Sequence, residues 1–116
     1  MIRMAFEKAV KLLGDTDTYT ISSDIKSYAL RDLGFTISKR GTYSYEAPLD
    51  QKSPFTPAAR LKITVSPELD GFKMNTVNQS GTMSVNIFSH DRTAEFTEQL
   101  NFILANLIAR DVLVKN

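Results

Sequence analysis

Residues 93–109 read TAEFTEQLNFILANLIA, and this stretch decides the fold. Its apolar residues recur at spacings of three and four, the period of an amphipathic helix: Phe96, Leu100, Ile103, Leu104, Leu107 and Ile108. Phe102 and Ala105 are expected to widen this stripe, and Asp91 or Thr93 is placed to cap the helix start. A stripe this broad needs an apolar partner surface, so we predict a helix packed on one face of a sheet.

The preceding segments alternate with the period of half-buried strands. Arg60–Val65, Phe72–Val77 and Met83–Ile87 each alternate apolar and polar residues, and turn-forming residues separate them. Phe35–Ala47 alternates too, and Gly41 at its middle indicates a bulge or bend. The sequence therefore predicts an antiparallel sheet of consecutive strands.

The N-terminal half is expected to supply a second helix. It begins at a cap on Ser22 or Ser23, runs to about Leu33 and ends at Gly34 as a left-handed terminator. The periodicity of Ile2–Leu13 fits a helix or a strand. Repeated prolines in 48–58 predict a long loop. Together the segments predict an α+β fold, an antiparallel sheet with two helices on one face.

Composition limits the classes of protein that fit. A chain of 116 residues has the size of a single domain, here 1–116. The absence of cysteine excludes disulfides, thiolate nucleophiles and cysteine zinc sites. Fourteen basic and thirteen acidic side chains leave a net charge of +1, which steers the protein only weakly toward nucleic acid. Without an apolar leader or an apolar stretch long enough to span a bilayer, we expect a cytoplasmic protein.

Short strings spread over nearly the whole chain are familiar as a set. They are AFEK at 5–8, YxLRDxGF at 28–35, KRG at 39–41, GFKM at 71–74, VNIF at 85–88 and ILANL at 103–107. Together they resemble a family of short uncharacterised proteins of lactic acid bacteria and relatives, labelled "putative amino acid metabolism". The resemblance implies a TATA-binding-protein-like fold of order β-α-β(4)-α, and hence a first strand within Ile2–Leu13. It implies no activity and no catalytic residue.

The residue types that carry chemistry form no recognisable catalytic or metal set. His90 lies in Ser89-His90-Asp91, but neighbours in sequence do not make a spatial triad, and capping residues are expected at a strand-to-helix turn. Asp15 and Asp17 faintly suggest oxygen ligation of a cation, although turn chemistry explains them better. The glycines form no phosphate-binding loop. We therefore predict no catalytic residue, no metal site and no cofactor.

The sheet face turned away from the helices is the first candidate site. Its ligand-binding candidates are Arg40, Arg60, Lys62 and Asn86, which suit a phosphate- or carboxylate-bearing ligand or RNA. A merely solvated sheet face has the same composition. Exposed aromatic residues for base stacking are scarce there. The sequence thus favours a solvated face over a nucleic-acid surface.

Two other places remain for a site. Phe55 in the proline-rich loop fits a partner anchor, a lid over a pocket or a staple under the sheet edge. A cavity beneath the C-terminal helix is the other place, although the wide aliphatic stripe predicts a filled core there.

The leading hypothesis is a small non-enzymatic accessory or binding protein, monomer or homodimer, with a protein partner in amino acid metabolism. The first alternative is RNA or anionic-ligand binding through the open polar face. The second is an enzyme with a pocket between the sheet and the C-terminal helix.

Overall fold

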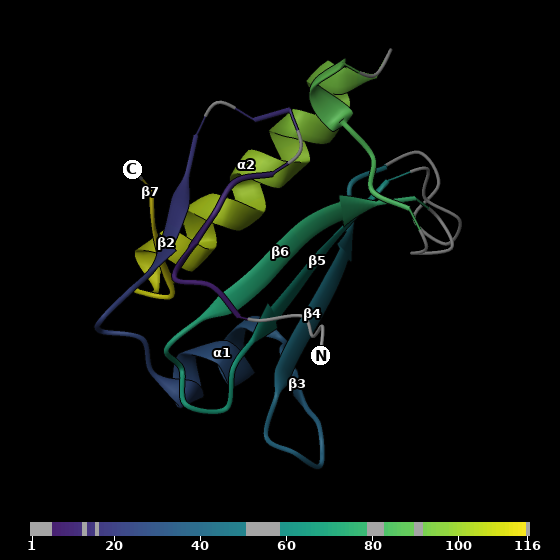
Figure 1. The fold of residues 1–116 in the computed structure, drawn as a ribbon. Coiled ribbons are helices and arrows are strands. Elements are labelled where there is room, and N and C mark those ends of the chain that lie inside the picture. Colours follow the sequence, from purple (N-terminus) through teal and green to yellow (C-terminus); the bar gives the residue numbers. More distant parts are fainter. Residues whose placement is uncertain are drawn as a thin grey trace.

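The computed structural model describes residues 6–12, 14–15, 17–50, 59–78, 83–89 and 92–115. Figure 1 shows how its elements are arranged. In chain order they are β1 (Ala9–Val10), β2 (Tyr19–Ile21), α1 (Ser27–Leu33), β3 (Thr36–Ile37), β4 (Tyr43–Pro48), β5 (Arg60–Val65), β6 (Phe72–Val77), the 3-10 helix η1 (Ile87–Ser89), α2 (Thr93–Ala109) and β7 (Leu113–Lys115). No helix within these described ranges is both long and apolar enough to cross a membrane.

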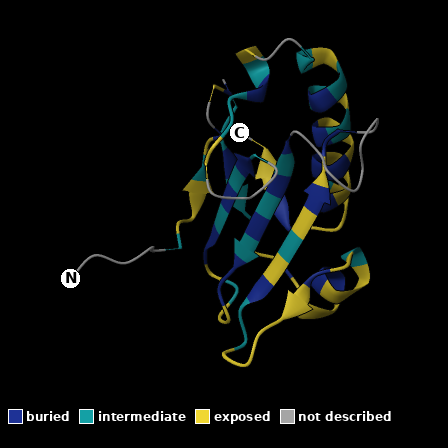
Figure 2. Ribbon diagram, turned by 90° about the vertical axis from the view of Figure 1, so that its right-hand side faces the viewer, coloured by how far each residue is buried: buried dark blue, intermediate teal, exposed yellow. Residues whose placement is uncertain are grey.

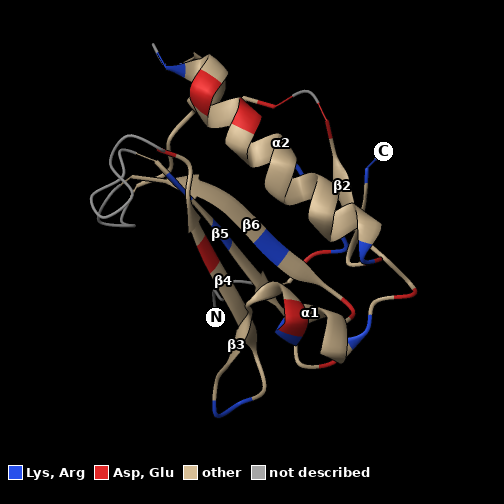
Figure 3. Ribbon diagram, turned by 180° about the vertical axis from the view of Figure 1, so that it is seen from behind, with Lys and Arg blue, Asp and Glu red and all other residues tan. Residues whose placement is uncertain are grey.

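The larger sheet is antiparallel, with strand order β3-β4-β5-β6. At its centre Ile63 lies opposite Tyr45 on one side and Met74 on the other. Burial alternates along these strands, as the banding in Figure 2 shows, because one side of each strand faces the core. Both helices cover that same face (Figure 3). The predicted α+β architecture is therefore confirmed.

Helix α2 has the bounds that its periodicity predicts. It buries Phe96, Leu100, Ile103, Leu104 and Leu107 against the sheet. The expectation that Phe102 and Ala105 widen the stripe is wrong, since both are exposed and Phe102 retains 64% of its surface. Phe102 lies two positions from Leu100 and from Leu104, a rotation of roughly 200° from each, so it points away from the core. Arg92 precedes the helix without a side-chain cap, and Asp91 lies outside the described residues.

The strand predicted at Met83–Ile87 is wrong. Ser84 forms only an isolated bridge with Val77, and Ile87 already begins η1. The sheet gains its fourth strand elsewhere, because Phe35–Ala47 folds back on itself as the hairpin β3–β4. Gly41, with φ of 89°, lies in the hairpin turn, where the Ser38 hydroxyl accepts hydrogen bonds from the backbone of residues 40 and 42.

A small sheet of order β1-β2-β7 lies beside the larger one. Of its three strands, only β1 was predicted from the sequence. The strand expected within Ile2–Leu13 is confirmed at Ala9–Val10, and residues 1–5 lie outside the description. Glu7 and Phe72 exchange two backbone hydrogen bonds of 3.0 and 2.8 Å. The N-terminal segment therefore joins both sheets.

Helix α1 begins later than predicted, because the residues before it form a separate turn. The Ser22 hydroxyl accepts a hydrogen bond from the Asp24 amide, and the Ser22 carbonyl accepts one from Ile25. The predicted end is confirmed: Gly34 has a left-handed φ of 106° and its amide donates to the carbonyls of Arg31 and Leu30.

Candidate ligand pocket between β4 and α2

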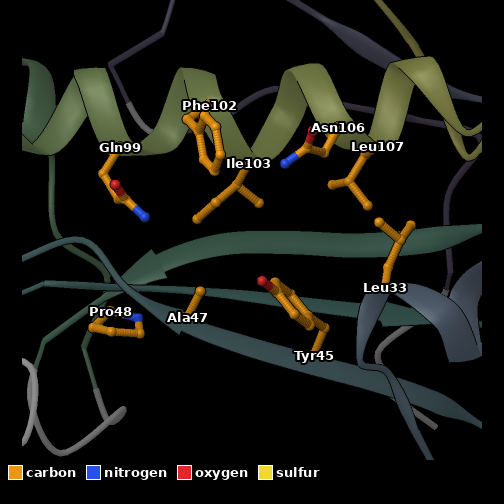
Figure 4. A pocket seen from close by; sticks show the side chains of 9 residues that line it. All are labelled: Leu33, Tyr45, Ala47, Pro48, Gln99, Phe102, Ile103, Asn106 and Leu107. Carbon is orange, nitrogen blue, oxygen red and sulfur yellow. The ribbon is translucent and has the colours of Figure 1, made fainter.

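A pocket of about 300 Å³ opens between strand β4 and helix α2, and the end of α1 closes one side of it. Figure 4 shows the side chains that line it. They are Leu33, Tyr45, Ala47, Pro48, Gln99, Phe102, Ile103, Asn106 and Leu107. Its volume falls at the small end of the range for ligand pockets. The core directly beneath α2 is filled, as expected, by the buried stripe of the helix. The pocket lies beside this core, on the side of the helix that faces β4.

Tyr45 occupies the floor of the pocket and contacts the two residues that connect α1 to β3, Gly34 and Phe35. Its ring stacks on Phe35 with centroids 5.1 Å apart and planes inclined by 25°. A Cβ atom on Gly34 would lie 3.6 Å from the same ring, an ordinary contact distance, so the left-handed φ of 106° rather than lack of space favours glycine at this position. Ala47, two residues along β4, has too small a side chain to fill the remaining space. The pocket thus results from a large and a small residue in consecutive core-facing positions.

Three polar groups converge on this apolar surface: the Tyr45 hydroxyl and the carboxamides of Gln99 and Asn106. None of the described residues that line the pocket is charged. Burial raises the pKa of Tyr45 above its ordinary value, so its hydroxyl remains protonated at neutral pH. The pocket therefore offers uncharged donors and acceptors on apolar walls.

The raised pKa of Tyr45 has a consequence at high pH. Since the folded protein favours the neutral phenol, Tyr45 contributes stability that is complete below about pH 10 and is lost as the pH rises through the folded-state pKa. A phenolate absorbance titration of the wild type and of Tyr45→Phe would isolate the ionisation of Tyr45 as the difference between the two curves. We expect this difference to appear at a higher pH than the ionisation of free tyrosine. Ionisation of Tyr45 at the ordinary value would contradict the burial argument.

The candidates on the open sheet face are only partly brought together. Arg60 and Lys62 both approach the Glu46 carboxylate, at 3.0 and 3.7 Å. Arg40 lies instead in the exposed β3–β4 turn. Asn86 lies beside η1, where its side chain accepts a hydrogen bond from the Phe88 amide. Glu46, which the sequence reasoning did not include, therefore offsets much of the positive charge expected on this face.

The remaining sequence candidates form no site within the described residues. Phe55 and His90 lie outside them. Asp15 accepts a hydrogen bond from the Asp17 amide at 3.0 Å, as its predicted turn role requires, and Asp17 pairs with Lys115. Across the part of the chain that is described, no three potential metal ligands cluster.

Sequence reasoning did not find the residues of the pocket. Tyr45 and Ala47 had the correct inward phase, but nothing in β4 alone indicated a space between them and α2. Gln99 and Asn106 could have indicated a polar site on α2. They place carboxamides beside its buried stripe, where amphipathic helices more often carry aliphatic or charged residues.

Comparisons with known proteins agree with this fold. The family DUF1831, described as "Putative amino acid metabolism", matches residues 4–114. A crystal structure of a DUF1831 family protein from Lactobacillus plantarum is similar over 98% of this chain and 100% of that one, with a TM-score of 0.92 and 48% sequence identity. A comparison with curated proteins found no match. Because the family match spans nearly the whole sequence, the chain belongs to the DUF1831 family.

Proposed function

We propose that this protein is a non-enzymatic binding protein that holds an uncharged, mostly apolar ligand in the pocket between β4 and α2. The observation that carries the proposal is the pocket itself, an apolar space of about 300 Å³ into which one hydroxyl and two carboxamides point. Small-molecule sites combine apolar walls with a few polar groups in this way. The description of the family supports a setting in amino acid metabolism, where the protein would serve as an accessory factor.

The chemistry of the described lining favours binding over catalysis. Proton transfer and nucleophilic attack in enzymes usually use imidazole, carboxylate, amine or thiol groups. Of the described residues that line the pocket, only Tyr45 has a titratable side chain, and its raised pKa keeps the phenol protonated at neutral pH. An enzyme that uses this pocket is the alternative, and it would need reactive groups brought by a partner or a cofactor.

RNA or anionic-ligand binding on the open face has weaker support. Glu46 lies between the two strongest candidate cations, and an incoming phosphate would have to displace its carboxylate from Arg60 and Lys62.

Two asparagines on α2 allow a matched test of the pocket. Asn106 lines the pocket, whereas Asn101 is exposed on the same helix and does not line it. We expect Asn106→Trp to weaken the binding of benzyl alcohol and 3-methylbutan-1-ol by about tenfold, because the indole would occupy ligand space. Amide chemical shifts in ¹H–¹⁵N spectra, followed at millimolar probe, measure that affinity.

Asn101→Trp adds the same side chain outside the pocket and is expected to bind like the wild type. Equal affinities in the two variants, or probe-induced shifts remote from β4 and α2, would count against this pocket as the binding site.

A further inference from the structure

We infer that the ligand of this pocket is a peptide in extended conformation, which pairs with the free edge of β4 at Glu46 and inserts one uncharged apolar side chain between β4 and α2. The inference rests on the proposed function and names its ligand class. It is argued from the backbone of β4, from the carboxamides of α2 and from the neutral lining of the pocket.

Strand β4 is paired along only part of its outer edge. Its inner edge pairs with β5 over all six residues from Tyr43 to Pro48. On the outer edge β3 pairs only with Tyr43 and Ser44. The residues before Thr36 belong to the end of α1 and not to the sheet, since the Phe35 amide donates to the Leu30 carbonyl. No described strand therefore continues along β4 beyond Ser44.

The direction of the Glu46 backbone groups follows from the antiparallel register. Leu49 donates to the Ala59 carbonyl on the β5 side at 2.9 Å, and successive residues of a strand alternate between its two edges. Ala47 and Tyr45 therefore bond toward β5, whereas Glu46 turns its N–H and C=O outward. Ser44, in the same phase as Glu46, accepts a hydrogen bond from the Thr36 hydroxyl on the β3 side.

Such an outward N–H and C=O on one residue can exchange two hydrogen bonds with one residue of an added antiparallel strand. Residues opposite each other share a face of the sheet, so the residue that pairs with Glu46 points away from the pocket. Its neighbour in the added strand, opposite Tyr45 or Ala47, points its side chain toward the pocket that these two residues line. Pro48 has no N–H and ends the usable edge. The edge thus accepts a short segment and resists open-ended strand addition.

The wall opposite β4 also suits a peptide. Gln99 and Asn106 each carry a donor and an acceptor, the same pair of groups that a peptide unit presents. They lie seven residues apart on α2, which is roughly 10 Å of helix and the length of about three extended residues. Phe102 lies between them and is mostly exposed, so its ring is available to cover a bound chain.

The neutral lining selects against free amino acids. A zwitterion would bring an ammonium and a carboxylate against apolar walls and carboxamides, and burying an unpaired charge is costly. A chain-internal segment, or a peptide with both ends blocked, presents amides in place of these charges. An apolar side chain such as that of leucine then fits the aliphatic part of the pocket, which Leu33, Ile103 and Leu107 provide.

Three probes with the same side chain test the ligand class: N-acetyl-leucine N-methylamide, free leucine and 3-methylbutan-1-ol. We expect the blocked leucine to bind at least about tenfold more tightly than the other two, because it alone offers uncharged peptide groups to both walls. Its binding should also slow hydrogen exchange of the Glu46 amide. If the alcohol binds as well as the blocked peptide, the peptide inference fails and the proposed function stands. If none of the probes binds, both fail.

Two variants of Glu46 isolate the backbone contact. Both remove the side chain and its ion pairs, but Glu46→Pro also removes the outward N–H, which the β4–β5 ladder does not use. Relative to Glu46→Ala, we expect Glu46→Pro to weaken binding of the blocked leucine by roughly two- to tenfold, the effect of one lost hydrogen bond. Binding of 3-methylbutan-1-ol should be the same in both. Equal peptide affinities in two folded variants would overturn strand pairing at Glu46.

Discussion

Phe96→Ala is expected to lower the free energy of unfolding by about 3–5 kcal/mol, the usual cost of removing a buried phenylalanine. Phe96 is fully buried in the first turn of α2 and is the first residue of its sheet-facing stripe. The Arg92 guanidinium also lies over its ring, 5.0 Å from the centroid. The truncation would therefore leave a cavity and remove a contact at the start of the helix. Urea denaturation followed by far-ultraviolet circular dichroism measures the change.

Phe102→Ala is the matched control on the same helix. Because its ring is mostly exposed, we expect a change within about 0.5 kcal/mol, typical of surface substitutions. Similar losses in both variants would show that the burial assigned to α2 is wrong.

Asp50→Ala is expected to lower the melting temperature by about 10 °C, because it leaves the Arg92 charge without its main partner. Asp50 retains only 3% of its side-chain surface and accepts two hydrogen bonds from Arg92, at 3.1 and 2.6 Å. The hydrogen bonds with Asp50, followed by those with Glu95, raise the pKa of Arg92 further above its usual range. Differential scanning calorimetry at neutral pH would measure the shift.

Glu46→Ala is the control for this ion pair. Glu46 also pairs with an arginine, but its side chain is 45% exposed, and exposed pairs contribute little in water. We expect its melting temperature to change by less than about 3 °C. Comparable shifts for Asp50→Ala and Glu46→Ala would mean that burial does not distinguish the two pairs.

The Asp50–Arg92 pair also matters for the proposed site. Asp50 follows the end of β4 by two residues, and Arg92 directly precedes α2. The pair therefore ties together the two walls of the pocket at one end. At the other end of α2, Arg110 pairs with Asp32 of α1 at 3.0 Å. The buried Asp50–Arg92 pair therefore helps to hold the start of α2 at a defined distance from the end of β4, which a binding groove requires.

Local periodicity by itself determined much of this protein. The bounds of α2, the strands β5 and β6, and the end of α1 at Gly34 all follow from residues within a few positions of one another. In a helix or strand with one buried face, apolar residues recur with the period of that element. These elements could therefore be predicted without knowledge of their partners.

Other features depend on residues that are distant in the sequence. The strands β1, β2 and β7 have two or three residues each, too few to show a period, and are defined by pairing between the two ends of the chain. Met83–Ile87 alternates like a strand but makes only one bridge to β6, because the chain turns into η1. A pattern shows that a segment can pair, whereas only the assembled sheet shows whether it does.

The candidate site belongs to this second class. Leu33, Tyr45 and Asn106 come from α1, β4 and α2, and the space between them exists only because α2 lies beside the outer edge of β4. Likewise, the outward N–H and C=O of Glu46 are available only because β3 begins at Thr36, opposite Ser44, and does not extend back to a position opposite Glu46. The sequence determined which faces are apolar. The tertiary structure alone decided where those faces fail to meet, since a cavity is a property of packing between elements rather than of any one element.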